Sequence, residues 1–326
     1  MSPENRMRVG AIDVGSNSIR LLVAELADPR APSGPLVTLA RAGEVCRLAR
    51  GLDRHPAIDL DLASRAGELA AEFMRRARSL GATRVVIGAT AALRNASNGS
   101  EVAEIIARRT GLPVRILTGD EEARLVYRSV VAGLGAGARR SACIVFDIGG
   151  GSTEVVSGLG EQPGRWVSLP FGAVSLTERH LASDPPAPAE LEALSREVRG
   201  AIMHHCAYMP ERTPLLAGVG GTVTVLASLD RRLHAYDPAL LEGWAITPGR
   251  LEELVERLAR STLEERRAGT AVGEGRADIV VAGAVVVREL AARFPSSGLV
   301  CSTQGLRYGL ARLAAAEAAD GGAAWT

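Results

Sequence analysis

One pattern of polar residues occurs twice in this chain and constrains its fold more than any other feature. The pattern Asp-x-Gly-x-x-Ser occupies residues 13–18 and recurs at residues 147–152, 134 positions further on. Each copy is preceded by an apolar, strand-like segment and followed by a β-prone one, so each copy predicts two strands joined by a tight polar turn. A strand–turn–strand unit duplicated within 326 residues indicates two structurally similar domains that face one ligand.

Both turns have the composition of an anion-binding loop. Glycine lets phosphate oxygens approach the backbone, and a tight turn of Gly, Ser and Asn points several N–H groups at one anion. The aspartate at the end of each first strand, Asp13 or Asp147, suits a hydrated Mg²⁺ that bridges to the phosphate. Two such loops facing each other would clamp a polyphosphate chain; the alternative is a pair of ordinary hairpins with Asx-type turns.

Three other segments have both a structural and a functional interpretation. Residues 120–122 are three acids that open a helix, where the helix dipole alone favours them, but a carboxylate near bound phosphates has a raised pKa and can act as a general base. Arg94 follows a buried strand, 84–88, and either pairs with phosphate or forms a surface ion pair. The turn 218–222 is either a third anion cradle or a tight strand–helix connection.

The basic residues of the chain exclude several mechanisms. All 38 are arginines, so no lysine serves a P-loop, a Schiff base or the usual protein-kinase site. Phosphate must therefore be held by arginine, backbone N–H groups or metal. We interpret arginine pairs such as Arg139-Arg140 and Arg231-Arg232 mainly as solvated faces, which could together guide a long anion.

Net charge, cysteine spacing and hydropathy limit the partners and the cellular location that we expect for the protein. A net charge of +1 and 3% aromatic residues argue against a nucleic-acid partner. The four cysteines are scattered without a C-x-x-C pattern, which argues against zinc and disulfides and favours a reducing cytoplasm. The apolar runs are too short for a membrane span and the polar first residues do not form a secretory signal, so we expect a cytoplasmic protein without a membrane partner.

Eight segments, taken in order, cover nearly the whole chain: 11–22 (AIDVGSNSIRLL), 89–98 (ATAALRNASN), 118–125 (TGDEEARL), 146–154 (FDIGGGSTE), 168–176 (SLPFGAVSL), 218–222 (GVGGT), 276–278 (RAD) and 302–307 (STQGLR). Together they resemble the exopolyphosphatase / guanosine-pentaphosphate phosphatase family. The resemblance implies the α/β fold of the actin-like ATPase superfamily, with two ribonuclease H-like domains around a central cleft and a mixed five-stranded sheet in each. In that fold the last helix returns to the first domain. We therefore expect one domain at 1–120 plus 304–326 and the other at 121–303.

The same resemblance implies hydrolysis of the terminal phosphate of linear inorganic polyphosphate by Mg²⁺-assisted attack of water. Glu122 matches the catalytic base of the family, with Arg94 and Glu154 as further catalytic residues, and Mg²⁺ or Mn²⁺ is expected on Asp13 and Asp147. The expected phosphate-binding residues come from both Asp-x-Gly turns and the third glycine turn: Gly15, Ser16, Asn17, Ser18, Gly149, Gly150, Gly151, Ser152, Gly220, Gly221 and Thr222.

Two other functions stay open at this point. The protein could instead convert guanosine pentaphosphate (pppGpp) to ppGpp, because both substrates end in a phosphoanhydride that the motifs do not distinguish. It could also be a nucleotide- or polyphosphate-binding actin-like protein with little turnover, although Glu122, Asp147 and Glu154 are all present. The resemblance is to the short type of the family and suggests a homodimer.

Overall fold

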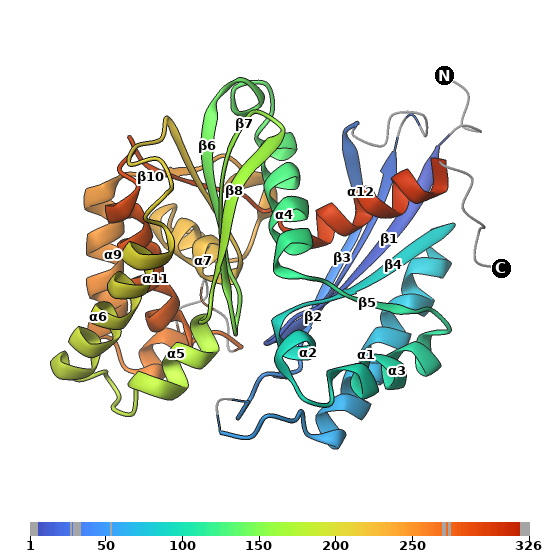
Figure 1. Ribbon diagram of the computed structural model, residues 1–326, viewed down its shortest axis with the longest axis horizontal. Coiled ribbons are helices and arrows are strands. Elements are labelled where there is room, and N and C mark those ends of the chain that lie inside the picture. The colour runs from blue at the N-terminus through green and yellow to red at the C-terminus, as the bar shows by residue number, and fades with distance from the viewer. Residues whose placement is uncertain are drawn as a thin grey trace. The chain divides into compact units, whose positions relative to one another are not determined.

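The computed structural model describes residues 6–26, 28, 34–52, 54–268, 272 and 275–319. Contacts within the chain separate two compact units (Figure 1). The first comprises residues Met1–Ser129 and Leu306–Thr326, and the second comprises Val130–Gly305. Helix α4 (Gly119–Leu134) contributes residues to both units. None of the described helices is long and apolar enough to cross a bilayer.

The first unit is built on a five-stranded sheet in the order β3-β2-β1-β4-β5 (Figure 1). Strands β1, β2 and β3 are antiparallel neighbours, whereas β4 and β5 run parallel to β1. Its elements besides α4 are β1 (Met7–Val14), β2 (Ser18–Leu26), β3 (Leu36–Val45), α1 (Leu60–Ser79), β4 (Arg84–Ala89), α2 (Ala91–Asn95), α3 (Gly99–Thr110), β5 (Val114–Ile116) and α12 (Leu306–Ala319).

Side chains of β1 and β2 alternate between two helix-covered faces of this sheet, as the period of two requires. Ile12 and Leu21 belong to the cluster that packs against α1 and α3. The opposite face, with Ala11 and Leu22, lies against α12. A Cβ atom added at Gly88 of β4 would come within 2.8 Å of the Leu310 side chain, so α12 sits directly on the strand backbone.

The second unit contains a six-stranded mixed sheet in the order β10-β11-β9-β6-β7-β8. The α/β class with two mixed sheets is confirmed, but this sheet has one strand more than the expected five. The extra strand, β10, has two residues, too few to produce a periodic signal in the sequence. The elements are η2 (Ala138–Arg140), β6 (Ala142–Ile148), β7 (Thr153–Leu159), β8 (Gln162–Leu169), α5 (Ala173–His180), α6 (Pro188–His205), β9 (Leu215–Val219), α7 (Gly221–Asp230), α8 (Pro238–Leu241), β10 (Ala245–Ile246), α9 (Pro248–Arg260), α10 (Leu263–Ala268), α11 (Val280–Arg293) and β11 (Leu299–Cys301).

The two units repeat one strand arrangement. In the first, the β1–β2 hairpin lies beside parallel β4, and in the second the β6–β7 hairpin lies beside parallel β9. The outer strands correspond as well, with β3 and β5 in the first unit matching β8 and β11 in the second. The turn of each hairpin carries one copy of the duplicated Asp-x-Gly-x-x-Ser pattern, which explains its recurrence in the sequence.

We expect Phe146→Ala to lower the free energy of unfolding by about 3–5 kcal/mol, because it opens a cavity in the core of the second unit. The ring is fully buried, and a Cβ atom added at Gly218 on β9 would lie 2.7 Å from it. Chemical denaturation of both proteins measures the difference. Leu159→Ala is the control, since its side chain is 66% exposed; equal stability losses for the two variants would contradict this account of the core.

Candidate active site

The two Asp-x-Gly turns have the same backbone geometry. The Gly15 N–H donates to the Ser18 carbonyl at 3.1 Å, and the Gly149 N–H donates to the Ser152 carbonyl at 3.0 Å. A Cβ atom on either glycine would lie 3.0–3.1 Å from that same carbonyl oxygen, so a side chain there would require a shift of a few tenths of an ångström. Both turns are therefore closed by one hydrogen bond that glycine permits.

Carbonyl groups of both turns are occupied by protein donors. In the first turn the Ser16 carbonyl accepts from the Ala49 N–H, and the Asn17 carbonyl accepts from the N–H groups of residues 46 and 47. In the second, the carbonyls of Gly149 and Gly150 accept from the first residues of α5, 173–175. Because these carbonyl oxygens are already hydrogen-bonded, an anion that approaches either turn would meet backbone N–H groups instead of carbonyl oxygens.

The residues that face the two aspartates differ between the units. Asp13 on β1 is paired across the hairpin with Arg20, whereas Asp147 on β6 is paired with Glu154. Directly opposed residues on one face have Cβ atoms about 4.5–5.5 Å apart. Glu154 is buried and accepts a hydrogen bond of 2.9 Å from the Ser168 hydroxyl on β8. The second turn thus begins beside two carboxylates, and the first beside a carboxylate and a guanidinium.

Asp13 is buried at the end of β1, and its burial raises its pKa above the ordinary value. The charges of Arg20 and Arg307 act in the opposite direction but do not cancel the effect of burial. A carboxyl group whose pKa is raised by folding stabilises the protein fully below the unfolded-state pKa, and this contribution is lost as the pH rises through the folded-state pKa. The ionised aspartate therefore costs stability at neutral pH.

We expect Asp13→Asn to unfold at a higher temperature than the wild type at about pH 8, because the amide avoids the cost of burying an ionised carboxylate. The difference should disappear at about pH 3, where Asp13 is protonated in both the folded and unfolded chain. Thermal melts across this pH range provide the measurement. A constant difference at every pH would show that the Asp13 charge is not its cause.

In the first unit, Arg94 and Glu122 are brought together although 28 residues separate them. Arg94, in the short helix α2, donates through Nη1 to Glu122 Oε2 at 2.8 Å and to the Leu117 carbonyl at 2.9 Å. Glu122 is only 6% exposed. The ion pair with Arg94 holds the Glu122 carboxylate in one orientation. Because the Thr90 N–H donates to the Val14 carbonyl at 3.3 Å, α2 begins next to the first Asp-x-Gly turn.

The other two acids at the start of α4 have structural roles. Glu121 accepts from the Thr118 N–H and hydroxyl, and the Thr118 hydroxyl accepts in turn from the Glu121 N–H, which forms a capping box. Asp120 pairs with Arg124 one turn later. Helix capping thus explains Glu121 and helix-surface pairing explains Asp120, but neither explains the buried Glu122.

In the second unit, the turn between β9 and α7 lies beside Asp147. Gly220 has a φ of +98°, and a Cβ atom there would lie 3.0 Å from Asp147 Oδ1. A Cβ atom on Gly305 would lie 3.8 Å from Asp147 Oδ2. Gly221 lies under the Arg276 side chain, and Thr222 is buried at the start of α7. The structure thus places the third glycine turn against the aspartate of the second Asp-x-Gly turn.

Three arginines near these groups were not among the residues selected from the sequence. Arg20 and Arg307 act on the Asp13 charge, and Arg276 covers Gly221. Extending the duplicated pattern by two residues would have shown that Arg20 stands where the second copy has Glu154. Arg276 lies in one of the eight family segments but carries no local signal of its position.

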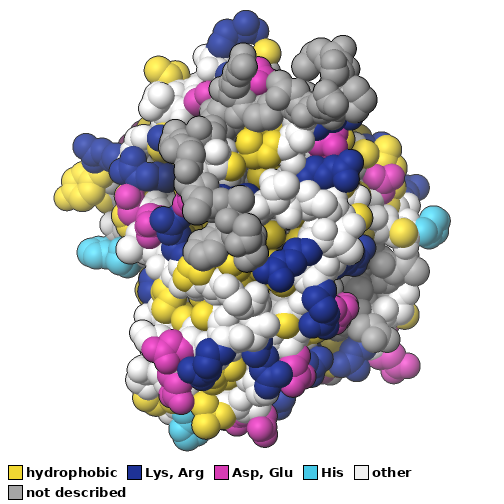
Figure 2. Space-filling model, turned by 90° about the vertical axis from the view of Figure 1, so that its right-hand side faces the viewer, with side chains coloured by type: hydrophobic (Ala, Val, Ile, Leu, Met, Phe, Trp, Pro, Cys, Tyr) yellow, Lys and Arg dark blue, Asp and Glu magenta, His cyan; other side chains and the backbone are white. Residues whose placement is uncertain are grey.

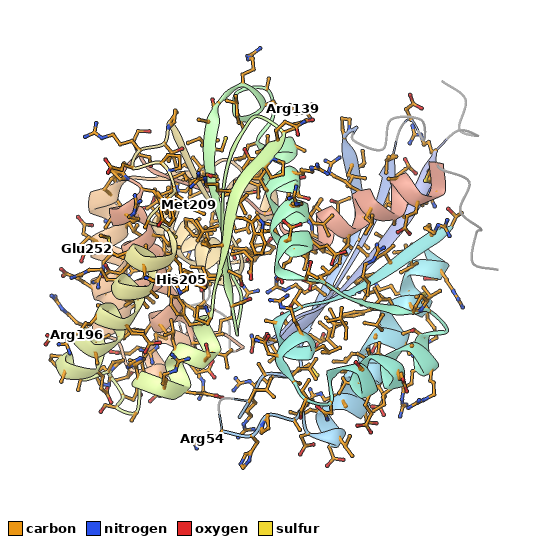
Figure 3. All side chains as sticks on the ribbon, viewed as in Figure 1. Arg54, Arg139, Arg196, His205, Met209 and Glu252 are labelled. Carbon is orange, nitrogen blue, oxygen red and sulfur yellow. The ribbon has the colours of Figure 1, made fainter. Side chains whose placement is uncertain are left out.

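Many other arginines lie on the surface and are paired with acids. Arg139, labelled in Figure 3, pairs with Glu161 at 3.1 Å, and Arg196 on α6 pairs with Glu192 at 2.6 Å. On the face drawn in Figure 2, arginine and acidic side chains are interspersed. These contacts fit the interpretation of such arginines as solvated faces, since exposed pairs of this kind contribute little to stability.

Asp147 and Glu154 offer a donor set that fits Mg²⁺. Both supply carboxylate oxygens from one sheet face, and two glycines leave room beside Asp147. Among the described residues, no group of three or more His, Cys, Asp or Glu side chains is placed to hold a metal. Two carboxylates suit Mg²⁺, which keeps several waters and takes its other ligands from substrate phosphates. Asp13 fits less well, because the Arg20 guanidinium already opposes it.

The cysteines do not contribute a nucleophile to this site. All four are described and buried, and none of them forms a disulfide. Burial raises the pKa of Cys206 to about 11, so this thiol stays protonated at neutral pH.

The fold and the paired Asp-x-Gly turns define an α/β protein of two units, in each of which a mixed sheet carries the same glycine turn. Residues 27–314 match the model of the Ppx/GppA phosphatase family. Exopolyphosphatase 2 of Mycobacterium tuberculosis is 34% identical over 290 residues, which cover 87% of this chain and 90% of that protein. The chain belongs to the Ppx/GppA phosphatase family and is a phosphatase.

Solved structures agree with this assignment. The crystal structure of the Aquifex aeolicus member of the Ppx/GppA family has a TM-score of 0.80 at 28% identity, covering 98% of this chain and 99% of that one. An exopolyphosphatase from Cytophaga hutchinsonii has a TM-score of 0.85 at 22% identity, covering 98% of this chain and all of that chain, and supports the fold alone.

Proposed function

We propose that the protein is an exopolyphosphatase, which hydrolyses the terminal phosphoanhydride of linear inorganic polyphosphate with Glu122 as general base. The observation that carries this proposal is the buried Glu122 carboxylate, held 2.8 Å from Arg94 beside a glycine turn suited to phosphate. The name of the M. tuberculosis relative, an exopolyphosphatase, supports polyphosphate as the substrate.

Glu122 orients the attacking water and accepts its proton, while Arg94 holds the carboxylate in place and offsets negative charge from the phosphate. The backbone amides of residues 16–18 and 150–152 bind phosphate oxygens, while those of Gly15 and Gly149 close the two turns, and the turn at 220–222 supplies further donors at the start of α7. Since phosphoryl transfer depends mainly on positioning and charge neutralisation, these groups suffice without a covalent intermediate.

Asp147 and Glu154 are the residues that would hold Mg²⁺, and Mn²⁺ would fit the same oxygen donors. When bound, the cation neutralises charge on the terminal phosphates. Glu154 is held by the Ser168 hydroxyl, so its carboxylate is oriented before the cation arrives. Asp13 remains a second candidate ligand, weakened by the guanidinium across the hairpin.

Phosphate release in the presence of Mg²⁺ tests the proposal, with polyphosphates of several lengths, pppGpp and ATP compared at equal concentrations of terminal phosphate. We expect the highest kcat/KM on polyphosphate and no release in excess chelator. Release from pppGpp alone would assign the protein to guanosine pentaphosphate hydrolysis. Failure to hydrolyse any of the three would leave a binding protein and overturn the catalytic proposal.

A further inference from the structure

Glu242, the residue that follows α8, forms a compact set of hydrogen bonds with a distant part of the second unit. Its Oε1 accepts from the Ser302 hydroxyl at 2.9 Å. Its Oε2 accepts from the Thr303 N–H at 2.6 Å and from the Thr303 hydroxyl at 2.7 Å. Ser302 and Thr303 are buried, so one carboxylate satisfies three donors that are shielded from water.

The segment that Glu242 holds leads from the central sheet to Asp147. The Ser302 N–H continues the pairing of β11 with β9 by donating to the Gly218 carbonyl at 2.9 Å. The Gln304 N–H then donates to the Ser302 hydroxyl at 3.2 Å. The next residue is Gly305, where an added Cβ atom would lie 3.8 Å from Asp147 Oδ2. Glu242 therefore holds the start of the turn 302–305, and the last residue of this turn lies next to Asp147.

Holding a turn with a carboxylate costs more free energy than holding it with a neutral side chain. Glu242 is partly buried, which costs a carboxylate more free energy than an amide or hydroxyl, and its charged hydrogen bonds are shorter and stronger than neutral ones. The Glu242 charge also acts on Cys301, the last residue of β11. Burial and this charge together raise the pKa of the Cys301 thiol to about 12. What the carboxylate adds is a tightly defined backbone position.

We infer that Glu242 is a positioning residue for the proposed reaction, acting through the turn 302–305 on the surroundings of Asp147. The expected effect of Glu242 on the rate rests on the proposed function. Its expected effect on the turn follows from its hydrogen bonds alone. A displacement of about 1 Å in a supporting element can lower a rate about 100-fold without a contact to the substrate. Loss of the three hydrogen bonds should act on kcat more than on KM, since Glu242 contacts neither Asp147 nor the amides proposed to hold the polymer.

Glu242→Ala and Glu242→Gln test this role, with Glu256→Ala as the matched control. Glu256 lies on α9 in the same unit and pairs with exposed Arg260 one turn away. For Glu242→Ala we expect kcat on polyphosphate to fall about 100-fold with KM changed less than about threefold. Glu242→Gln should recover part of this loss, because its carbonyl oxygen still accepts from one side while its amide nitrogen cannot accept from the Thr303 N–H.

Two measurements do not depend on activity. Hydrogen exchange followed by mass spectrometry should show faster exchange in a peptide spanning residues 299–306 of Glu242→Ala, with unchanged exchange in β9 and α6. Direct titration of the metal-free protein with Mn²⁺ should show weaker binding in Glu242→Ala than in the wild type and in Glu256→Ala.

Each outcome has a definite meaning. An inactive wild type would reject the proposed function, and the exchange and Mn²⁺ measurements would still decide the role of Glu242. Wild-type kcat, exchange and Mn²⁺ affinity in Glu242→Ala would overturn the inference. So would a loss of activity accompanied by faster exchange throughout the second unit, because Glu242 would then support the fold and not the turn.

Discussion

Glu122→Gln is expected to lower the rate of phosphate release from polyphosphate about 1000-fold, while polyphosphate still binds. A positioned general base contributes about 10²–10⁴-fold to a rate, and an amide cannot accept the proton of the attacking water. The substitution preserves the size of the side chain, and the amide oxygen can still accept from Arg94 Nη1. The loss should therefore appear in kcat with little change in KM.

Glu121→Gln is the matched control for this experiment, since it makes the same chemical change one residue earlier. Glu121 is exposed and caps α4, and a glutamine oxygen can still accept from the Thr118 N–H. Its activity should stay within about twofold of the wild type. Steady-state phosphate release and equilibrium binding of labelled polyphosphate provide the two measurements. Wild-type activity in Glu122→Gln would remove Glu122 as the base.

Asp147→Asn is expected to lower the rate about 100- to 1000-fold at saturating substrate, because a cation ligand supplies several kcal/mol of charge stabilisation and each 1.36 kcal/mol changes the rate tenfold. Asp13→Asn, the same substitution in the duplicated turn, should cost less than about tenfold. The difference follows from the residues across each hairpin, since Glu154 adds a second carboxylate beside Asp147 while Arg20 opposes Asp13.

Two measurements show which of the two aspartates, Asp13 or Asp147, holds the cation. The Mg²⁺ concentration for half-maximal activity should rise in Asp147→Asn and stay nearly constant in Asp13→Asn. Mn²⁺ titration of the metal-free proteins should show the same order without reference to activity. Equal losses in both variants would mean that the two turns contribute equally to the cation site, and a larger loss in Asp13→Asn would reverse the assignment.

Local features of the site could be predicted from the sequence, because they depend on residues close together in the chain. The turns at 13–18 and 147–152 are examples, since a glycine with acidic and hydroxyl neighbours between two apolar runs has few other conformations. The helix that starts near residue 119 is another, because its acids and Thr118 mark an N-terminus.

Features that depend on tertiary packing could not be predicted in this way. The Arg94–Glu122 pair forms because α2 and α4 meet next to β4 and β5, and no spacing in the sequence encodes that meeting. The contact of Glu242 with residues 302–303 spans 60 positions for the same reason. β10 forms only because β11 offers an edge to two residues. The contrast between Arg20 and Glu154 is different, since both residues lie two positions beyond a copy of the duplicated pattern and are visible in the sequence.

The place of α12 in the sequence determines when the first unit can be completed during protein synthesis. All residues of the second unit leave the ribosome before α12 does, so the second unit can fold while the first still lacks a helix. Until then the face of the first sheet with Ala11 and Leu22 has no cover, and exposed apolar strands of this kind invite chaperone binding or aggregation. The unit whose synthesis starts first therefore cannot be completed until the last helix has been made.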